Sequence, residues 1–399
     1  MSLLKTDILI SGGGVAGLTA AAAFGTAGFQ VVCVDPAPPV TQPDAAGSDL
    51  RTTAFLQPSR RLLARAGLWD ALAPHAAALE IMRIVDAGGN SATARDIADF
   101  NAAELSDEPF GWNLPNWLLR REMLARLAAL ETVRFLPGIA TGQVITREGD
   151  ARVLLSDGRM AVARLLIAAD GRNSNIRRQL GIGVRTWRYG QKALVFAVGH
   201  PVPHQNVSTE IHRTGGPFTL VPLPDLDGQP RSAVVWMERG PRIKALQALP
   251  QEAFEAEIFQ RSAGLFGPMR LLSRRDVWPI ISQHAQSLTA QRTALIAEAA
   301  HVVPPIGAQG LNMSLADMTC LLDLAQESPA TLGSAAMLEK FQRGRMRDIR
   351  TRVAGIDLLN RASMAENPML RDLRRYGLKT LHDVAPLRKT IMRAGLGAT

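Results

Sequence analysis

The stretch TDILISGGGVAGLTAAAAFGTAGFQVVCVD, residues 6–35, decides the fold of this chain. It begins with a short apolar strand at residues 6–11, and a run of three glycines follows at once. An alanine-rich helix is expected over residues 18–27, and a second strand over residues 30–34 ends in Asp35. A strand, a glycine turn, a helix and a second strand in this order predict a Rossmann-type sheet.

The glycines of this stretch have the spacing G-x-G-x-x-G, which is typical of dinucleotide-binding proteins when it joins a strand to a helix. Gly12 is expected in the tight turn, Gly14 where the backbone approaches a pyrophosphate, and Gly17 where the helix packs against the strand. The N–H groups at the start of the helix, with Ala16 just before it, would hold the phosphates. Asp35 lies at about the distance expected of an acid that accepts hydrogen bonds from a ribose. We therefore expect this stretch to bind a dinucleotide.

The stretch LIAEAAHVVPPIGAQGLNMSLAD, residues 295–317, indicates a further part of such a site. It starts in an apolar strand, places Glu298 at the strand's end and turns at two prolines, which cannot continue a strand or a helix. A helix is expected from Leu311 onward. Its free N–H groups and partial positive charge favour an anion, or a ring that becomes anionic when it is reduced. A plain strand–turn–helix corner is the alternative interpretation.

This second stretch resembles the third flavin motif of the single-component FAD-dependent aromatic hydroxylases. It is most similar to the ubiquinone-biosynthesis hydroxylase branch, whose pattern is roughly GDAAH-x-x-x-P-x-x-G-Q-G-x-N-x-G-x-x-D. The chain departs from the pattern where Ala297 and Glu298 replace Gly-Asp, and where Ala308 and Ser314 each replace a glycine. Glu298 keeps the carboxylate that the family places on the ribityl chain of the flavin, one methylene longer.

A match to the family's second motif, D-G-x-x-S-x-x-R, lies between these stretches, at DGRNSNIR in residues 170–177. The resemblance implies that Asp170 and Gly171 hold ribose or riboflavin hydroxyls. It also implies that Arg51 and Arg120 contact the cofactor, with the arginine after Arg120 as a rival. An ordinary strand-end turn and surface arginines are the alternatives.

The resemblance therefore implies an FAD site made from the three motifs and two arginines. Its expected residues are Gly12, Gly14, Ala16, Gly17, Asp35, Arg51, Arg120, Asp170, Gly171, Glu298, Pro305, Gly307, Gln309, Gly310, Leu311 and Asn312. The sequence has one G-x-G-x-x-G only, which agrees with a family in which NAD(P)H docks transiently as co-substrate. The resemblance implies that the reduced flavin takes up O2 as a C4a-hydroperoxide and transfers one oxygen atom to an aromatic ring.

No catalytic residue is predicted, because the cofactor carries this chemistry. His212 could deprotonate a phenol, since histidine titrates near neutrality. A surface position on a strand is the simpler interpretation of His212. His301 lies inside the third motif and is expected to position its neighbours.

The predicted fold class is α/β: a Rossmann-type FAD-binding domain with an inserted mixed β-sheet substrate domain and C-terminal helices. The FAD-binding domain is expected at residues 1–75, 105–182 and 285–330, and the substrate domain at residues 76–104 and 183–284. Residues 331–399 are expected to be helical. Local expectations are a hairpin turning at Gly88-Gly89, a helix over residues 118–127, a turn at residues 157–158, and helices over residues 337–359, 362–375 and 378–393.

The composition and net charge of the chain indicate which classes of binding partner it can have. The formal net charge is +9, and residues 331–399 hold fourteen Lys and Arg against six Asp and Glu, which gives +8. Such a balance suits nucleic acid, an anionic surface or an acidic partner. No nucleic-acid-binding motif accompanies it, so we expect an anionic membrane surface or a quinone-biosynthesis complex instead. The seven scattered histidines predict no metal site, and the two distant cysteines favour a reducing, cytoplasmic setting.

The resemblance implies a polyprenylated phenol or benzoquinol of ubiquinone biosynthesis as the substrate, and an enzyme that is cytoplasmic or peripheral at the inner membrane. Two other classes stay open at this point. One is an FAD-dependent reductase or dehydrogenase of a lipid, and the other is a flavoprotein without turnover in a biosynthetic complex.

Overall fold

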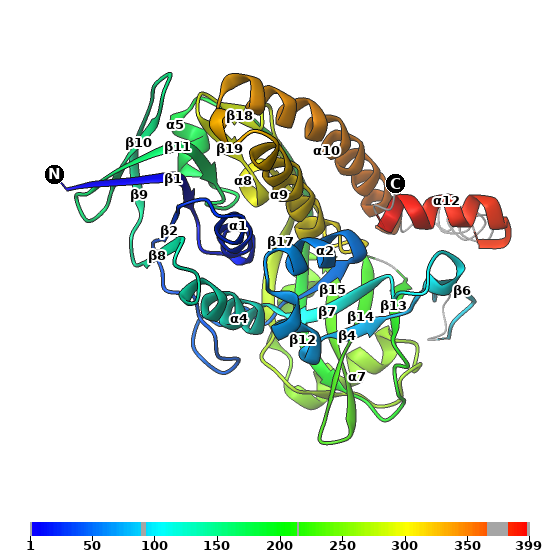
Figure 1. Cartoon of the computed structure of the whole chain (residues 1–399). Coiled ribbons are helices and arrows are strands. Elements are labelled where there is room, and N and C mark those ends of the chain that lie inside the picture. The colour runs from blue at the N-terminus through cyan, green and yellow to red at the C-terminus, as the bar shows by residue number, and fades with distance from the viewer. Residues whose placement is uncertain (1, 89–92, 214, 365–381, 397–399) are drawn as a thin grey trace.

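The computed structural model describes residues 2–88, 93–213, 215–364 and 382–396 (Figure 1). The first sheet has the order β18-β19-β11-β1-β2-β8, with β10 and β9 added beside β11. Neighbours from β19 to β8 are parallel, which confirms the Rossmann-type prediction. The strands are β1 (Leu3–Ser11), β2 (Val31–Asp35), β8 (Val133–Pro137), β9 (Thr141–Thr146), β10 (Ala151–Leu155), β11 (Met160–Ala168), β18 (Thr289–Ala290) and β19 (Thr293–Leu295).

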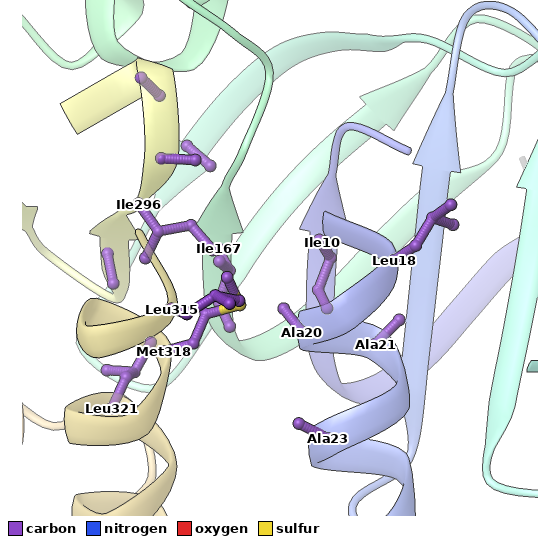
Figure 2. Packing of buried hydrophobic residues seen from close by; sticks show 14 of the residues in the cluster. Ile10, Leu18, Ala20, Ala21, Ala23, Ile167, Ile296, Leu315, Met318 and Leu321 are labelled. Carbon is purple, nitrogen blue, oxygen red and sulfur yellow. The ribbon is translucent and has the colours of Figure 1, made fainter. Parts of the chain in front are cut away.

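The helices α1 (Val15–Thr26) and α9 (Gln309–Glu327) bury their apolar sides at this sheet. Figure 2 shows Leu315 of α9 beside Ile167 of β11, and Ala20 of α1 near Ile10 of β1. Leu18 projects from the other side of α1. All five of these side chains are fully buried. Burying one Leu or Ile side chain contributes about 1.5–3 kcal/mol, so this contact fixes both helices. Both helices begin earlier than predicted, because residues 15–17 and 309–310, which were expected in the turns, are already helical.

The second sheet has the order β20-β17-β12-β15-β14-β13-β5-β6, with β16 beside β12. It is mixed, since β13 and β5 are parallel and the other neighbours are antiparallel. Its strands are β5 (Ile81–Asp86), β6 (Asp96–Asn101), β12 (Val184–Gly199), β13 (Val207–His212), β14 (Pro217–Leu226), β15 (Gln229–Arg239), β16 (Arg270–Leu271), β17 (Asp276–Ala285) and β20 (His301–Val302). Nearly all come from the two segments assigned to the substrate domain, although the exact division into domains stays a prediction.

One face of the second sheet carries a core of its own. Phe196, Phe218 and Trp236 are buried there together with Phe254, which belongs to α7 (Gln251–Arg261). The helix α6 (Gly240–Ala248) adds Ile243 to the same core. The opposite face, which includes Ala193 and Val195, packs with the first sheet's core. The site described below lies on that opposite face.

A small third sheet, β3-β7-β4, was not predicted. Residues 52–56, directly after Arg51, form a strand because they pair with β7. The remaining elements of this part are β3 (Thr52–Leu56), α2 (Gln57–Arg65), α3 (Trp69–Leu72), η1 (Ala73–His75), β4 (Ala77–Leu79), η2 (Ala102–Glu104), β7 (Gly111–Pro115), α4 (Asn116–Ala128) and α5 (Asn175–Gln179).

The local expectations are partly confirmed. The turn at residues 157–158 and the helix over residues 118–127 are present. β5 and β6 form the expected hairpin, but its turn falls partly on residues 89–92, outside the described residues.

The short helix α8 (Ala297–Ala300) precedes α9 in the chain. After α9, the C-terminal segment begins with η3 (Pro329–Thr331). The helix α10 (Ala335–Ser363) contains the first predicted C-terminal helix and crosses the top of the molecule in Figure 1. Most of the second predicted helix lies outside the described residues. The third, expected over residues 378–393, is described only from residue 382 onward, where α12 (Ala385–Leu396) covers most of it. Pro386 lies in the first turn of α12, where proline is well tolerated.

Candidate functional site

The three motifs meet at one edge of the first sheet. Gly12 follows β1, Asp170 follows β11 and Glu298 follows β19, and these three strands are parallel neighbours. Asp35 ends the next strand, β2. The carboxyl ends of parallel strands are where open α/β sheets bind ligands. Segments that lie far apart in the sequence therefore form one site.

Backbone packing explains two of the three motif glycines. Gly12 has φ +114°, and a Cβ atom there would lie 2.2 Å from the carbonyl oxygen of Ala169. A Cβ atom on Gly17 would lie 1.8 Å from the carbonyl oxygen of Gly12. A Cβ atom on Gly14 would meet nothing within 4 Å. Gly12 and Gly17 are thus required by the fold, while Gly14 leaves open space for a ligand.

The start of α1 fits a pyrophosphate. This helix of 12 residues has no acidic residue in its first turn and no side-chain cap on its N-terminal N–H groups. Asp35 accepts hydrogen bonds from the N–H groups of Gly13 and of Ala37, which hold its carboxylate beside the turn. Free N–H groups and the helix dipole favour phosphate oxygens here.

The second motif supplies a buried acceptor. Oδ2 of Asp170 accepts hydrogen bonds from the N–H groups of Asn175 and Ile176, at 2.8 and 3.2 Å. Oδ1 of Asp170 is buried and has no partner among the described residues. A buried acceptor without a donor costs about 1–3 kcal/mol, so this oxygen fits a hydroxyl of the cofactor.

The arginine of the second motif ties it to the third. Arg177 is 4% exposed and donates hydrogen bonds to the carbonyl oxygens of Ala299, at 2.8 Å, and of Arg172, at 2.9 Å. Burial lowers the pKa of the Arg177 guanidinium, although the negative charge of Asp170 partly offsets this effect. Arg177, the last residue of the D-G-x-x-S-x-x-R motif, therefore links the second motif to the third.

Glu298 has a partner that sequence reasoning missed. Nε of Arg172 lies 3.2 Å from Oε2 of Glu298, and both side chains are partly exposed. Arg172 occupies a variable position of the D-G-x-x-S-x-x-R motif, so no motif signal could reveal it. The ion pair leaves the second carboxylate oxygen of Glu298 for a ligand.

The two alanines that replace family glycines keep the backbone shape that glycine favours. Ala297 has φ +56° and Ala308 has φ +55°, both in the left-handed region. That region costs an alanine roughly 1–2 kcal/mol. These two alanines therefore add backbone strain to the third motif but keep its backbone conformation.

Side chains at the start of α9 are engaged within the protein. Gln309 donates to the carbonyl oxygens of Gly307 and Gly395 and accepts from Arg352. Asn312 accepts from the N–H of Leu56 and donates to two backbone carbonyls. The backbone N–H groups of the first turn, which also contains Gly310 and Leu311, therefore remain for a ligand. Gly171, Gly307 and Pro305 lie in the turns that flank this edge.

Arg51 is held in a polar cluster between the two sheets. Its guanidinium donates two hydrogen bonds to Asp49, at 2.8 and 2.7 Å, and lies 4.0 Å over the ring of Trp278. Arg120 lies 3.5 Å from the same carboxylate, and its buried Nε has no partner among the described residues. Burial would raise the pKa of Asp49, but the hydrogen bonds and charge of Arg51 outweigh burial and lower it. Asn116 also donates to Asp49.

Behind the third motif lies a buried charged cluster. Asp317 is fully buried and binds Nε2 of His301 at 2.6 Å and Nε of Arg345 at 2.7 Å. Arg345 also pairs with Asp348. Burial would lower the pKa of the Arg345 guanidinium, but the carboxylates of Asp317 and Asp348 outweigh burial and raise it. This cluster joins the third motif to α9 and α10, which supports the positioning role expected of His301.

A cavity lies between the motif edge and the second sheet. Arg51, Arg172 and Glu298 line one side, and apolar residues of β12, β15 and β17 line the other. The apolar lining is formed by Ala193, Val195, Phe196, Ala233, Val234, Val235, Trp278, Ile280 and Ile281. Pro305 also lines the cavity. Its position next to residues of the second and third motifs fits a flavin ring and an apolar substrate.

His212 differs from its sequence-based interpretation. It is not a surface residue, since its side chain is 14% exposed and its Nε2 lies 2.7 Å from Oε1 of Glu210. Within the described residues, no group of three or more His, Cys, Asp or Glu side chains is arranged to hold a metal ion. None of the helices that the structure describes is long and apolar enough to cross a membrane.

Comparisons with known proteins agree with this fold and with FAD as the cofactor. A family model described as "FAD binding domain" matches residues 5–347. Ubiquinone hydroxylase UbiL of Rhodospirillum rubrum is 34% identical over 395 residues, covering 98% of this chain and 89% of that protein. The 3-demethoxyubiquinol 3-hydroxylase of Escherichia coli is 28% identical over 402 residues and covers 100% of both chains. The crystal structure of p-nitrophenol 4-monooxygenase PnpA from Pseudomonas putida has a TM-score of 0.79 at 18% identity and covers 99% of both chains.

The three motifs at one sheet edge, the adjoining apolar cavity and these matches define an FAD-dependent monooxygenase. The chain belongs to the FAD-binding-domain family, whose model covers most of its length. It uses FAD as its cofactor, and NAD(P)H as co-substrate fits this class of enzyme.

Proposed function

We propose that this enzyme hydroxylates the aromatic ring of a polyprenylated phenol or benzoquinol in ubiquinone biosynthesis. The observation that carries the proposal is the 34% identity to a ubiquinone hydroxylase over 98% of this chain. The apolar cavity beside the flavin motifs supports it, because a prenylated ring needs a dry, apolar wall. When bound, FAD reduced by NAD(P)H supplies the activation of O2 for transfer of one oxygen atom to the ring.

We further propose a division of labour among the chain's own residues. The N–H groups around Gly14 and Ala16 bind the pyrophosphate, and Asp35 and Asp170 accept from ribose or ribityl hydroxyls. Glu298 accepts from the ribityl chain. The free N–H groups of Gly310 and its neighbours would stabilise the negative charge that the flavin ring gains on reduction. The apolar lining on β12 and β15 excludes water from the reacting atoms.

The test is hydroxylation under labelled oxygen. The FAD-loaded enzyme, NAD(P)H and a short-chain prenylated phenol are incubated under 18O2, and the products are measured by mass spectrometry. The proposal expects one labelled oxygen atom in the ring and oxygen-dependent NAD(P)H oxidation that the phenol stimulates. A product with a reduced double bond and no label would favour a lipid reductase instead. No turnover with any ring would favour a flavoprotein without catalysis.

We also propose peripheral binding at an anionic membrane, where a prenylated substrate resides. The outer side of α10 carries Leu358 and Leu359, which are 69% and 57% exposed. Arg347 and Arg350 are exposed on the same helix and, within the described part of the chain, have no acidic partner within 4 Å. Each basic side chain near an anionic surface contributes about 1 kcal/mol, screened by salt. Arg361 on the same helix pairs with Asp357 at 2.9 Å, and residues 369–375, which add further basic and apolar side chains, lie outside the described residues.

Liposome flotation tests the membrane proposal. Wild type should float with anionic vesicles at low salt and less at high salt or with neutral lipid. The double variant Leu358→Ser, Leu359→Ser should float less, while Glu339→Gln, which lies on α10 away from these leucines, should not. Equal recovery with anionic and neutral vesicles at both salt concentrations would contradict electrostatic docking.

A further inference from the structure

The face of the second sheet that lines the cavity continues beyond it into strands with polar side chains. Val195 on β12 and Val235 on β15 line the cavity and are direct partners in the antiparallel ladder. Val235 pairs in turn with Thr219 on β14, and Thr219 pairs with Glu210 on β13. Directly paired residues of antiparallel strands share a face, and so do residues two apart on one strand. Glu210 and His212 therefore lie on the cavity's side of the sheet.

Glu210 and His212 form an acid–imidazole pair that is largely buried. Their side chains are 7% and 14% exposed, and Oε1 of Glu210 lies 2.7 Å from Nε2 of His212. The Nδ1 atom of His212 is buried and lacks a hydrogen-bond partner within the described residues. A carboxylate only accepts hydrogen bonds, so it makes Nε2 the donor and leaves a lone pair on Nδ1. The structure thus holds an oriented proton acceptor whose donor is not supplied by the described chain.

We propose that Nδ1 of His212 accepts the proton of the substrate's phenolic hydroxyl and that Glu210 stabilises the imidazolium formed. The O–H bond of the phenol breaks, an N–H bond forms at Nδ1, and the electron pair stays on the phenolate oxygen. The phenolate ring is richer in electrons and is a better nucleophile toward the oxygen atom that it receives. This assignment rests on the proposed function, because it needs a hydroxylated ring as substrate.

Other charged groups around the pair have partners of their own. Asp86 lies beside His212 in register on β5, and its Oδ1 accepts from Arg95 at 3.0 and 2.7 Å. The carboxylate of Glu238 on β15 packs against the glycine turn after β13. Arg261 of α7 donates to backbone carbonyls at both ends of that turn. Among these groups, only Glu210 is within hydrogen-bond distance of the imidazole in the described structure.

A small phenol tests the pair without any need for turnover. Vanillin is a methoxyphenol whose phenolate form absorbs at longer wavelength than its neutral form. Difference spectra of vanillin with the FAD-loaded enzyme, recorded across a pH series, give the pH at which the bound phenol ionises. In wild type we expect this pH to lie below that of free vanillin. In His212→Asn and in Glu210→Gln it should rise by at least about one pH unit, a tenfold change in the ionisation equilibrium.

The matched control is His204→Asn. His204 also has a nearby carboxylate, Asp225 at 3.8 Å, but its Nε2 is bonded to the carbonyl oxygen of Leu223. This variant should ionise vanillin as wild type does. Retention of FAD and an unchanged circular dichroism spectrum show that the variants are folded. If His212→Asn does not fold, Glu210→Gln decides, since it keeps the shape of the side chain.

Three outcomes would overturn the proposal: no binding of vanillin to wild type, no lowering of its ionisation pH, or the same ionisation pH in wild type and in folded variants of the pair. With the physiological ring as substrate, the variants should also lower kcat by on the order of 10²-fold. A failure of the proposed function would look different. The enzyme would then ionise vanillin through His212 and yet give no hydroxylated product.

Discussion

The glycine turn after β1 and the turns of the third motif are proposed to bind one cofactor, but they depend on glycine in different ways. At Gly12 and Gly17 a Cβ atom would lie 2.2 and 1.8 Å from a backbone oxygen. At Ala297 and Ala308 a Cβ atom is present, and the backbone still has φ near the left-handed values of +56° and +55°. The first turn needs glycine because backbone packs on backbone. The third motif needs a conformation, which alanine adopts at a cost.

The largest effect is expected where backbone meets backbone. Gly17→Val should prevent α1 from docking on β1, because no movement of a flexible side chain can make room. We expect little folded protein and no bound FAD. Gly310→Ala, in the third motif, should fold, since a Cβ atom there would lie 4.0 Å from Val303. Expression, circular dichroism and flavin content measure both. A folded Gly17→Val protein would contradict the claim that the first turn needs glycine for steric reasons.

The third motif is held by side chains instead, and its buried ion cluster should show the next largest effect. Arg345→Ala leaves Asp317 buried with one of its two partners, so we expect a loss of about 3–5 kcal/mol in the free energy of unfolding. Arg347→Ala, on the exposed side of the same helix, should change it by less than about 0.5 kcal/mol. Denaturant unfolding of FAD-loaded protein measures both. Equal stabilities would show that the cluster does not hold the motif.

Glu298 should affect the cofactor more than the fold. Glu298→Ala removes a charge-assisted hydrogen bond worth about 1.5–3 kcal/mol, so the Kd for FAD should rise roughly tenfold or more. The far-ultraviolet circular dichroism should be unchanged, because Glu298 is partly exposed and pairs only with Arg172 among the described residues. Glu327→Ala at the exposed end of α9 is the control. An unchanged Kd would remove Glu298 from the proposed site.

The smallest effect tests the conformational half of the comparison. Ala308→Gly relieves a left-handed alanine and should raise the free energy of unfolding by about 1 kcal/mol or less. Ala325→Gly, in the regular part of the same helix, should lower it by about 0.5–1 kcal/mol. Opposite signs in a thermal or denaturant melt support the account. A loss of stability in both variants would mean that Ala308 is not strained.

Sequence patterns predicted the parallel sheet, the hairpin of β5 and β6 and the meeting of three motifs, because each rests on local chemistry. Residues that act through distant contacts could not be predicted in this way. Arg172 reaches Glu298 only once β11 and β19 are neighbours, and Trp278 meets Arg51 only across two sheets. His212 was placed on the surface because strand alternation does not reveal what covers a face. The third small sheet was missed for the same reason, since β3 exists through its pairing with β7.

Gly14 tests the central claim most directly, namely that the glycine turn holds the pyrophosphate of FAD. A Cβ atom on Gly14 would meet no protein atom within 4 Å, so Gly14→Val should fold as wild type does. Its side chain would occupy the space that the pyrophosphate needs. The measurement is the amount of FAD released from equal amounts of folded wild-type and variant protein. The account predicts a folded variant with little or no FAD, and full flavin occupancy in Gly14→Val would contradict it.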